Sequence, residues 1–261
     1  MNVSDFKRMK AASQKIAMTT CYDYWSACIL NESKIDALLV GDSAAMVMHG
    51  HSSTISATTD VMVYHTASVA RGARDKFIIS DLPFMSYCKG LVPAMETVDV
   101  LMKAGANAVK LEGVEGLQDL IKQIVQSGAP VMGHLGLMPQ SVNRLGGYKV
   151  QGRGSEAQTL LIQQAKQLEN AGCFAVVLEC VPSTVGQTIS HHVNIPTIGI
   201  GAGRHVDGQV LVLHDLMGFN RDPKKFVREF TNGFEIVRSA ANKFTEVVKD
   251  GTFPSNSNSY E

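Results

Sequence analysis

The sequence has no apolar run long enough to cross a bilayer and no excess of either charge. Its longest uninterrupted apolar run is Cys173–Leu178, far short of the roughly 18 residues that a membrane helix needs. Lys and Arg together number 24, and so do Asp and Glu. A chain without net charge lacks the basic surface that is typical of proteins binding nucleic acids or anionic membranes. We therefore expect neither nucleic acid nor a membrane among its partners.

Cysteine is scarce and charged residues are few. The chain has 5 cysteines, an odd number, and no CxxC pair. This pattern is typical of neither a disulfide framework nor a zinc finger, and it indicates a reducing compartment. The segment Met1–Lys10 also lacks the apolar stretch of a secretory signal, so we expect a cytoplasmic protein. Charged residues make up 18% of the chain, below the usual share of about 25%, which favours a surface partly covered by neighbouring subunits.

Short apolar segments alternate with longer amphipathic segments along most of the chain. The predicted strands are Ile16–Thr20, Ala37–Val40, Phe77–Ser80, Ala108–Leu111, Val131–Gly133, Ala175–Leu178, Thr197–Ile200 and Val210–Leu213. Apolar residues on both faces are typical of parallel strands covered by helices. Helical spacing of apolar residues predicts helices over Leu117–Gln126 and Ser155–Asn170. A last helix is expected over Pro223–Lys249, with Asp222 as its N-cap.

Eight strands separated by segments of crossover length predict an α/β fold of the (β/α)₈ or TIM-barrel type. An open, doubly wound sheet stays an alternative, because periodicity does not show whether a sheet closes. Barrels of about 250 residues commonly form one unit, so we expect a single catalytic domain over residues 1–253. Residues 254–261 are rich in Ser and Asn, and we expect them to form a mobile tail.

Polar side chains end five successive predicted strands, from the second to the sixth. They are Asp42 with Ser43, Asp81, Lys110 with Glu112, His134, and Glu179. Catalytic groups of such barrels lie at the carboxyl ends of the strands. Lys110 and Glu112 are two positions apart, so both side chains point to the same face of the fourth strand.

Three of these residues, Asp42, Asp81 and Glu112, would form a cluster of carboxylates. Like charges that close together require a divalent cation or a shared proton, and hard oxygen ligands suit Mg²⁺. Lys110 could hold a substrate carboxylate or a developing enolate oxygen. Each residue alone also has a simpler explanation, since an Asp after a strand is often a helix N-cap and Lys110 could only neutralise Glu112. The succession of ionisable residues along neighbouring strands favours a functional site.

Six short motifs occur in order along the chain. They are Val40–Ser43, Ser80–Met85, Val109–Gly113, Gly133–Leu137, Leu178–Pro182 and Ile198–Gly203. In this order they closely resemble the ketopantoate hydroxymethyltransferase family, and the resemblance extends from about Thr19 to Gly218. It implies a TIM barrel, a homodecamer, Mg²⁺, and 5,10-methylenetetrahydrofolate as co-substrate. The implied reaction transfers a hydroxymethyl unit to 3-methyl-2-oxobutanoate through a Mg²⁺-stabilised enolate, giving ketopantoate in pantothenate biosynthesis.

The resemblance also implies a role for each strand-end residue. It assigns the metal to Asp42, Asp81 and Glu112, and it assigns the 2-oxo acid to Asp42, Ser43, Asp81 and Lys110. Glu179 would be the proton acceptor, and His134 is a further contact on the substrate side.

Two other functions stay open at this point. A related Mg²⁺-dependent lyase or mutase acting on 2-oxo acids would use the same carboxylates without folate. A non-catalytic barrel that binds a metabolite would hold the oxo acid without removing its C3 proton.

Overall fold

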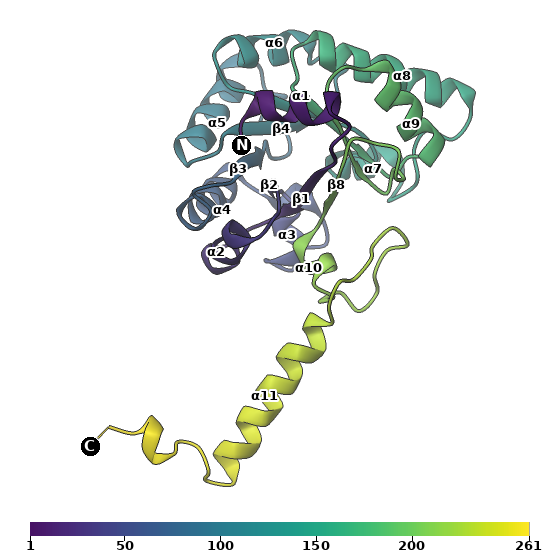
Figure 1. Ribbon diagram of the computed structural model, residues 1–261. Helices are drawn as coiled ribbons and strands as arrows, with labels where there is room; N and C mark the ends of the chain where they lie inside the picture. Colours follow the sequence, from purple (N-terminus) through teal and green to yellow (C-terminus); the bar gives the residue numbers. More distant parts are fainter. Residues whose placement is uncertain (261) are drawn as a thin grey trace. The chain divides into compact units, whose positions relative to one another are not determined.

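A computed structural model describes residues 1–260 of the chain, and its eight parallel strands form a closed barrel (Figure 1). The strands are β1 Ile16–Thr20, β2 Ala37–Val40, β3 Phe77–Asp81, β4 Ala108–Glu112, β5 Val131–Gly136, β6 Ala175–Glu179, β7 Thr197–Ile200 and β8 Gly208–Leu211. They are paired in sequence order, and β8 closes the barrel against β1. The predicted TIM barrel is thus confirmed, and the open sheet is excluded.

Helices surround the barrel and connect its strands (Figure 1). They are α1 Val3–Ala11, α2 Tyr24–Glu32, α3 Ala44–Val47, α4 Thr59–Gly72, α5 Leu91–Lys103, α6 Gln118–Gln126, α7 Val142–Leu145, α8 Ser155–Asn170 and α9 Ser183–His192, with 3₁₀ turns η1 Thr54–Ser56 and η2 Pro139–Ser141. The predicted helix over Ser155–Asn170 is confirmed, and the one over Leu117–Gln126 starts one residue later. Among the described residues, no helix combines the length and the apolar character needed to span a bilayer.

The described residues divide into two compact units, Met1–Leu211 and the residues from Val212 on. All eight strands belong to the first unit. The second contains α10 Leu213–Leu216, α11 Gly233–Lys249 and η3 Asn256–Asn258. The domain boundary expected at residue 253 and the mobility of residues 254–261 stay predictions.

Several element boundaries differ from the predictions. Strands β3, β4 and β6 each end one residue later and β5 ends three residues later, whereas β8 and the last helix are displaced. Strand β8 starts at Gly208 rather than Val210, because the missing side chain lets the backbone lie against Ile16, whose carbonyl oxygen would be 2.5 Å from an added Cβ. The predicted last helix is wrong over its first ten residues, since α11 starts at Gly233 with Asn232 as its N-cap. The amide of Phe230 donates to the carbonyl of Leu216, so the preceding chain folds back instead of continuing as a helix.

The alternation of side chains along the strands separates an apolar layer from a polar layer inside the barrel. Inward positions such as Ile79, Ala108, Met132 and Val177 belong to one buried apolar cluster. Two residues further along each strand the same face carries Asp81, Lys110, His134 and Glu179, respectively. The barrel interior is therefore filled by apolar side chains toward the amino ends of the strands, and it carries ionisable side chains at their carboxyl ends.

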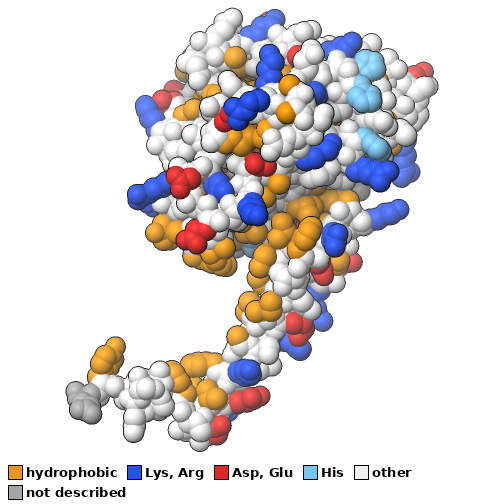
Figure 2. All heavy atoms as spheres, in the orientation of Figure 1, with side chains coloured by type: hydrophobic (Ala, Val, Ile, Leu, Met, Phe, Trp, Pro, Cys, Tyr) orange, Lys and Arg blue, Asp and Glu red, His pale blue; other side chains and the backbone are white. Residues whose placement is uncertain are grey.

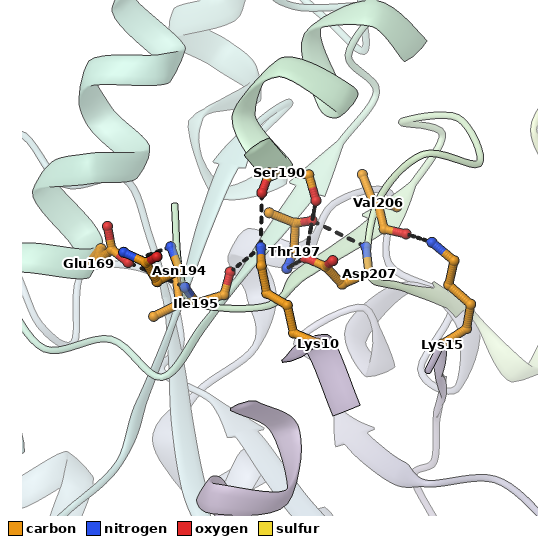
Figure 3. Close-up of polar contacts among 9 residues, drawn as sticks. All are labelled: Lys10, Lys15, Glu169, Ser190, Asn194, Ile195, Thr197, Val206 and Asp207. Atoms are coloured by element: carbon orange, nitrogen blue, oxygen red, sulfur yellow. Dashed lines mark hydrogen bonds and ion pairs between the residues drawn. The ribbon is translucent and has the colours of Figure 1, made fainter. Parts of the chain in front are cut away.

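Helix α1 lies at the opposite end of the barrel. Its buried Phe6 makes edge contacts with Phe77 and Phe174, at ring-centroid distances of 5.4 and 5.1 Å. Lys10 donates to Ser190 O at 2.9 Å and Ile195 O at 3.0 Å, and it pairs with Asp207 Oδ2 at 2.8 Å (Figure 3). These contacts attach the helix to the segments around β7 and β8.

Asp207 is the acceptor on which this network converges. Its Oδ2 also accepts hydrogen bonds from Thr197 N at 2.8 Å and from Ser190 Oγ at 3.0 Å (Figure 3). Partial burial raises the pKa of the Asp207 carboxyl, but the bonds from Lys10 and Thr197 outweigh it and hold this pKa below its usual value. The charged form of Asp207 therefore stabilises the fold.

We predict that Asp207→Asn lowers the free energy of unfolding by about 1–3 kcal/mol near pH 7, because hydrogen bonds to a charged acceptor are lost. The folded pKa lies below the unfolded value of about 3.9. The stabilisation is thus present above that value and is lost as the pH falls through the folded pKa. Urea unfolding at neutral pH and at about pH 3 measures the loss of stability and its dependence on pH. Asp99→Asn, at an exposed pair with Lys103, is the control, and an equal loss in both variants would contradict the prediction.

Candidate active site

Asp81 and Lys110 form a buried ion pair at the carboxyl ends of β3 and β4. Lys110 Nζ lies 2.9 Å from Asp81 Oδ1, and both side chains are at least 95% buried. The other oxygen, Asp81 Oδ2, accepts a hydrogen bond from the backbone amide of Asp42 at 3.0 Å. These contacts join residues from the ends of β2, β3 and β4, so the sequence-predicted gathering of Asp42, Asp81 and Lys110 is present.

His134 connects the fourth and the sixth strand. Its Nδ1 lies 3.3 Å from Glu112 Oε1, and its Nε2 lies 3.4 Å from Glu179 Oε2. Lys110 Nζ is 3.5 Å from the same Nδ1. The strand register explains the first contact, because Glu112 and His134 are directly paired across β4 and β5. The structure thus places His134 between two carboxylates, and its predicted contact with the substrate stays a prediction.

Ser43 lies at the edge of this group. It precedes α3 and its hydroxyl is 2.9 Å from the hydroxyl of the buried Tyr22. Ser43 thus neighbours Asp42 in sequence, and its side chain faces a residue from the loop after β1. Its role toward a substrate stays a prediction.

The carboxyl groups of the site outnumber its basic groups, which are Lys110 and His134. Burial, and then the charges of Asp81 and Glu112, raise the pKa of Asp42 well above its usual value. Burial also raises the pKa of Asp81, although Lys110 acts in the opposite direction. For Lys110 itself burial lowers the pKa, but the surrounding carboxylates, Asp81 first, outweigh it, so its pKa lies above the usual value.

His134 is a base whose charged form the site favours. Burial and the charge of Lys110 lower its pKa, but the hydrogen bonds to Glu112 and Glu179 outweigh them and raise that pKa to about 9. A protonated imidazole donates from both ring nitrogens. His134 can therefore orient one oxygen of each carboxylate at neutral pH.

The carboxylate chemistry fits a divalent cation bound in an open site. Asp42 and Asp81 both have raised pKa values because like charges are buried together, and a cation would relieve that repulsion. Within residues 1–260, no three His, Cys, Asp or Glu side chains enclose one point as a preformed metal cage. Mg²⁺ commonly binds through one or two carboxylates and completes its shell with water and substrate oxygens. The residues present thus fit Mg²⁺ in that mode.

Gln140 is a site residue that sequence analysis missed. From η2, its Nε2 donates to Asp42 Oδ2 at 2.8 Å and to Leu82 O at 2.9 Å, and its backbone amide donates to Glu112 Oε2 at 3.1 Å. Tyr87 donates to its Oε1 at 2.8 Å, which fixes the orientation of the amide. Gln140 therefore positions two of the three carboxylates. Its place just after Pro139 in the loop following β5 was the available signal, but a neutral side chain in a loop does not by itself indicate a contact with carboxylates.

A closed (β/α)₈ barrel with an acidic and basic cluster at the carboxyl ends of its strands defines a barrel enzyme of the kind whose active site lies at that rim. The chain belongs to the ketopantoate hydroxymethyltransferase family, whose sequence profile matches residues 1–256. Family membership and the names of its relatives make it an enzyme of hydroxymethyl transfer in the ketopantoate pathway.

Two bacterial relatives illustrate the likeness. The 3-methyl-2-oxobutanoate hydroxymethyltransferase of Coxiella burnetii (strain Dugway 5J108-111) is 54% identical over 256 residues, which cover 97% of this chain and 96% of that protein. The enzyme of the same name from Bdellovibrio bacteriovorus is 55% identical over 259 residues, covering 99% and 98%. These relatives favour hydroxymethyl transfer over the lyase, mutase and non-catalytic alternatives.

Solved structures share the fold at much lower identity. A phosphonopyruvate hydrolase in complex with oxalate and Mg²⁺ matches 99% of this chain and 93% of its own, with a TM-score of 0.64 and 11% identity. A 2,3-dimethylmalate lyase of the PEP mutase/isocitrate lyase superfamily matches 97% and 90%, with a TM-score of 0.63 and 14% identity. At this identity the likeness concerns the barrel alone.

We predict that Gln140→Met lowers turnover about 10–100-fold, the usual effect of removing a group that orients an active-site ligand. The variant keeps a similar volume but leaves Asp42 Oδ2 and Leu82 O without their donor. Tyr87→Phe should have a smaller effect in the same direction, because the amide stays but can turn. Steady-state kinetics measure both. Gln126→Met, on the exposed end of α6, is the matched control, and unchanged turnover in Gln140→Met would refute the positioning role.

Proposed function

We propose that this enzyme transfers a hydroxymethyl unit from 5,10-methylenetetrahydrofolate to C3 of 3-methyl-2-oxobutanoate and forms ketopantoate. The observation that carries the proposal is the inward-facing row of Asp81, Lys110, Glu112, His134 and Glu179, in a chain whose relatives bear that enzyme name. The C3–H bond breaks and a bond forms from C3 to the methylene carbon of the folate. Both carbon–nitrogen bonds of that methylene bridge break, water supplies the hydroxyl oxygen, and tetrahydrofolate leaves with two protons on its nitrogens, one originating from C3 and one from water.

Glu179 is the proposed acceptor of the C3 proton. It ends β6 and is half-buried, so its carboxylate can reach a substrate at the rim. His134 Nε2 lies 3.4 Å from Oε2, so the imidazole stands beside one oxygen of the proposed base. The C3 proton is acidic only because the resulting carbanion delocalises into the adjacent ketone, so the base must be held in place beside C3.

Lys110 is the proposed partner of the substrate carboxylate. The neighbouring carboxylates raise its pKa, so it stays protonated throughout the working pH range. Within residues 1–260 its ion pair is with Asp81, and an ammonium has three donors. Lys110 can thus hold Asp81 and a substrate oxygen together, and it offsets negative charge that develops on the substrate.

Asp42 and Asp81, with Glu112 nearby, would hold Mg²⁺. When bound, Mg²⁺ supplies Lewis-acid chemistry that favours the enolate form of a 2-oxo acid. The excess of buried carboxylates over bases, expressed in the raised pKa values of Asp42 and Asp81, supports this assignment. Gln140 occupies Asp42 Oδ2, so Asp42 Oδ1 is the oxygen it can offer to the cation.

The enzyme is further proposed to assemble as a homo-oligomer, and the family resemblance implies a decamer. In the second unit, α11 has apolar side chains on its surface, which Figure 2 shows as hydrophobic patches along that segment. Val237, Phe244 and Val248 are spaced seven and four residues apart and are 58%, 58% and 46% exposed. That spacing places them on one face of the helix, and contiguous exposed apolar surface of this kind marks a protein interface.

We predict that Glu179→Gln lowers the rate of deuterium exchange at C3 of the oxo acid about 10²–10⁴-fold, the usual contribution of a general base. The amide has nearly the same shape but cannot take a proton from carbon. Exchange in D₂O without folate, followed by NMR, isolates this step. Glu156→Gln, on the exposed start of α8, is the control. Exchange at the unaltered rate in Glu179→Gln would assign the base to another group.

We predict opposite effects of Asp42→Asn on the metal-free protein and on Mg²⁺ binding. Removing one of the crowded charges leaves the free protein at least as stable, because burial and like charges disfavour ionised Asp42. The unaltered protein should gain about 2.7 kcal/mol at a Mg²⁺ concentration 100 times the Kd, and the variant should gain much less.

Thermal unfolding with and without Mg²⁺ measures this difference. Chelation should abolish turnover of the unaltered enzyme, and Asp119→Asn, a 92% exposed position, serves as the control. Equal stabilisation of both proteins by Mg²⁺, or full activity after chelation, would contradict the assignment.

A further inference from the structure

Three histidines that the proposed reaction does not use lie together beside α4. His65 belongs to α4, and His49 and His51 belong to the segment that joins α3 to η1. The ring centroids of His49 and His65 are 5.0 Å apart, and those of His49 and His51 are 6.4 Å apart. Within residues 1–260, none of the three rings lies at hydrogen-bond distance from a carboxylate. This group of imidazoles therefore differs in chemistry from the carboxylate cluster at the barrel rim.

The nitrogen atoms of two of these rings face each other. His49 Nε2 lies 3.0 Å from His65 Nε2, and the two ring planes are inclined by 30°. An ion that binds imidazole at about 2.0–2.1 Å separates two such nitrogens by about 2.9–3.4 Å when the ligand angle is about 90–110°. The pair therefore has the spacing of two ligands on one metal ion.

The remaining ring nitrogen of His65 fixes the tautomer of this side chain. Its Nδ1 lies at hydrogen-bond distance from the backbone carbonyl of Tyr22, and because a carbonyl oxygen only accepts, Nδ1 carries the hydrogen. Neutral His65 therefore presents a lone pair at Nε2 toward His49. Histidines that bind metals usually donate from their second nitrogen to a backbone carbonyl or a carboxylate. His65 is 6% exposed, so its surroundings hold it in the orientation of a ligand.

The loop that carries His49 and His51 has a fixed backbone and exposed side chains. The amides of these two residues donate to Ala44 O at 3.1 Å and to Ala45 O at 2.9 Å, respectively. Gly50, between them, has a φ of 74°, a conformation that glycine adopts without steric cost. Both imidazoles are exposed, and the ring of His51 makes no hydrogen bond within residues 1–260. An ion can thus reach the pair from solvent, and His51 is free to turn toward it.

Neighbouring imidazoles favour the metal-binding form of His49. Burial first, and then the charges of His65 and His51, lower the pKa of His49 below its usual value. A metal binds the unprotonated nitrogen of a neutral imidazole. His49 is therefore available as a ligand at neutral pH.

We propose that His49 and His65 bind a transition-metal ion of the Zn²⁺ or Ni²⁺ type, with His51 as a third ligand and water completing the shell. The first two ligands are in place, and His51 turns inward on binding, since no three such side chains within residues 1–260 already enclose one point. On binding, the hydrogen of His49 Nε2 is lost to water and Nδ1 of the same ring takes one up. Both rings stay neutral, and both Nε2 lone pairs face the ion.

The ligand chemistry separates this site from the proposed Mg²⁺ site. Imidazole suits Zn²⁺, Cu²⁺ and Ni²⁺, whereas carboxylates and water suit Mg²⁺ and Mn²⁺. An ion held by His49 and His65 would also join the loop after α3 to α4, and it would stabilise the folded chain by binding only to that state. Neither effect involves the oxo acid or folate, so the inference does not depend on the proposed function.

The test measures Ni²⁺ binding to the full-length, tag-free protein by titration calorimetry, with Mg²⁺ in large excess. His49→Gln keeps an amide donor for His65 Nε2 but removes a ligand. Its Ni²⁺ affinity should fall by at least about 10–100-fold, the effect already seen when only an outer partner of a ligand is removed. His51→Gln should weaken Ni²⁺ binding by a smaller factor. Binding of Mn²⁺, which prefers oxygen ligands, should be the same in both variants as in the unaltered protein.

His192→Gln, on the exposed end of α9 and next to another histidine, is the matched control and should leave Ni²⁺ binding unchanged. Thermal unfolding without added metal checks that each variant is folded, and Ni²⁺ should raise the Tm of the unaltered protein more than that of His49→Gln. Equal Ni²⁺ affinity in the unaltered protein and His49→Gln, or no Ni²⁺ binding in the unaltered protein, would overturn the proposal. An equal loss in His192→Gln would also overturn it, because surface histidines would then bind the ion without a defined site.

Discussion

The burial of Lys110 against Asp81 is the constraint on which the rest of the active site depends. An ammonium and three carboxylates are withdrawn from water within one layer of the barrel, and each must find partners there. The backbone amide of Asp42, the imidazole of His134 and the amide of Gln140 supply them. These donors each satisfy a single carboxylate oxygen, and burial still raises the pKa of Asp42 and Asp81. The arrangement therefore holds its carboxylates at a cost in stability, which is consistent with the proposed metal site.

The two ends of the barrel show how a structural ion pair differs from a functional cluster. At the α1 end, the donors around Asp207 outweigh its burial and lower its pKa. At the opposite end, burial and neighbouring charges outweigh the donors and raise the pKa of Asp42 and Asp81. Functional sites commonly contain titratable groups whose pKa is shifted so that the charged form is disfavoured. The aspartates at the two ends of the barrel thus differ in which effect is larger, although each end pairs an aspartate with a lysine.

The sequence was sufficient to find the eight strands and to predict that the ionisable side chains at their carboxyl ends lie together, because both follow from local patterns. Two-residue alternation places Lys110 and Glu112 on one face, and strand order brings their neighbours together. It was insufficient for Gln140, a neutral residue that reaches Asp42 across 98 positions. It also misplaced the start of α11, because Asp222 and Pro223 form a good N-terminal signal, whereas the amide of Phe230 donates to Leu216 O and the chain folds back there. Long-range contacts decided both cases.

The loop after β3 links these observations. Its ends are fixed by buried hydrogen bonds to Lys110 and Gln140, so its middle presents Phe84 and Met85 to solvent from a rigid base. A base of that kind holds bound groups more precisely than a free loop does. Gln140 contacts this loop and two carboxylates at once. Gln140 thus joins the loop after β3 to the carboxylate cluster, and the donor of Asp42 Oδ2 is held in place by the backbone of that loop.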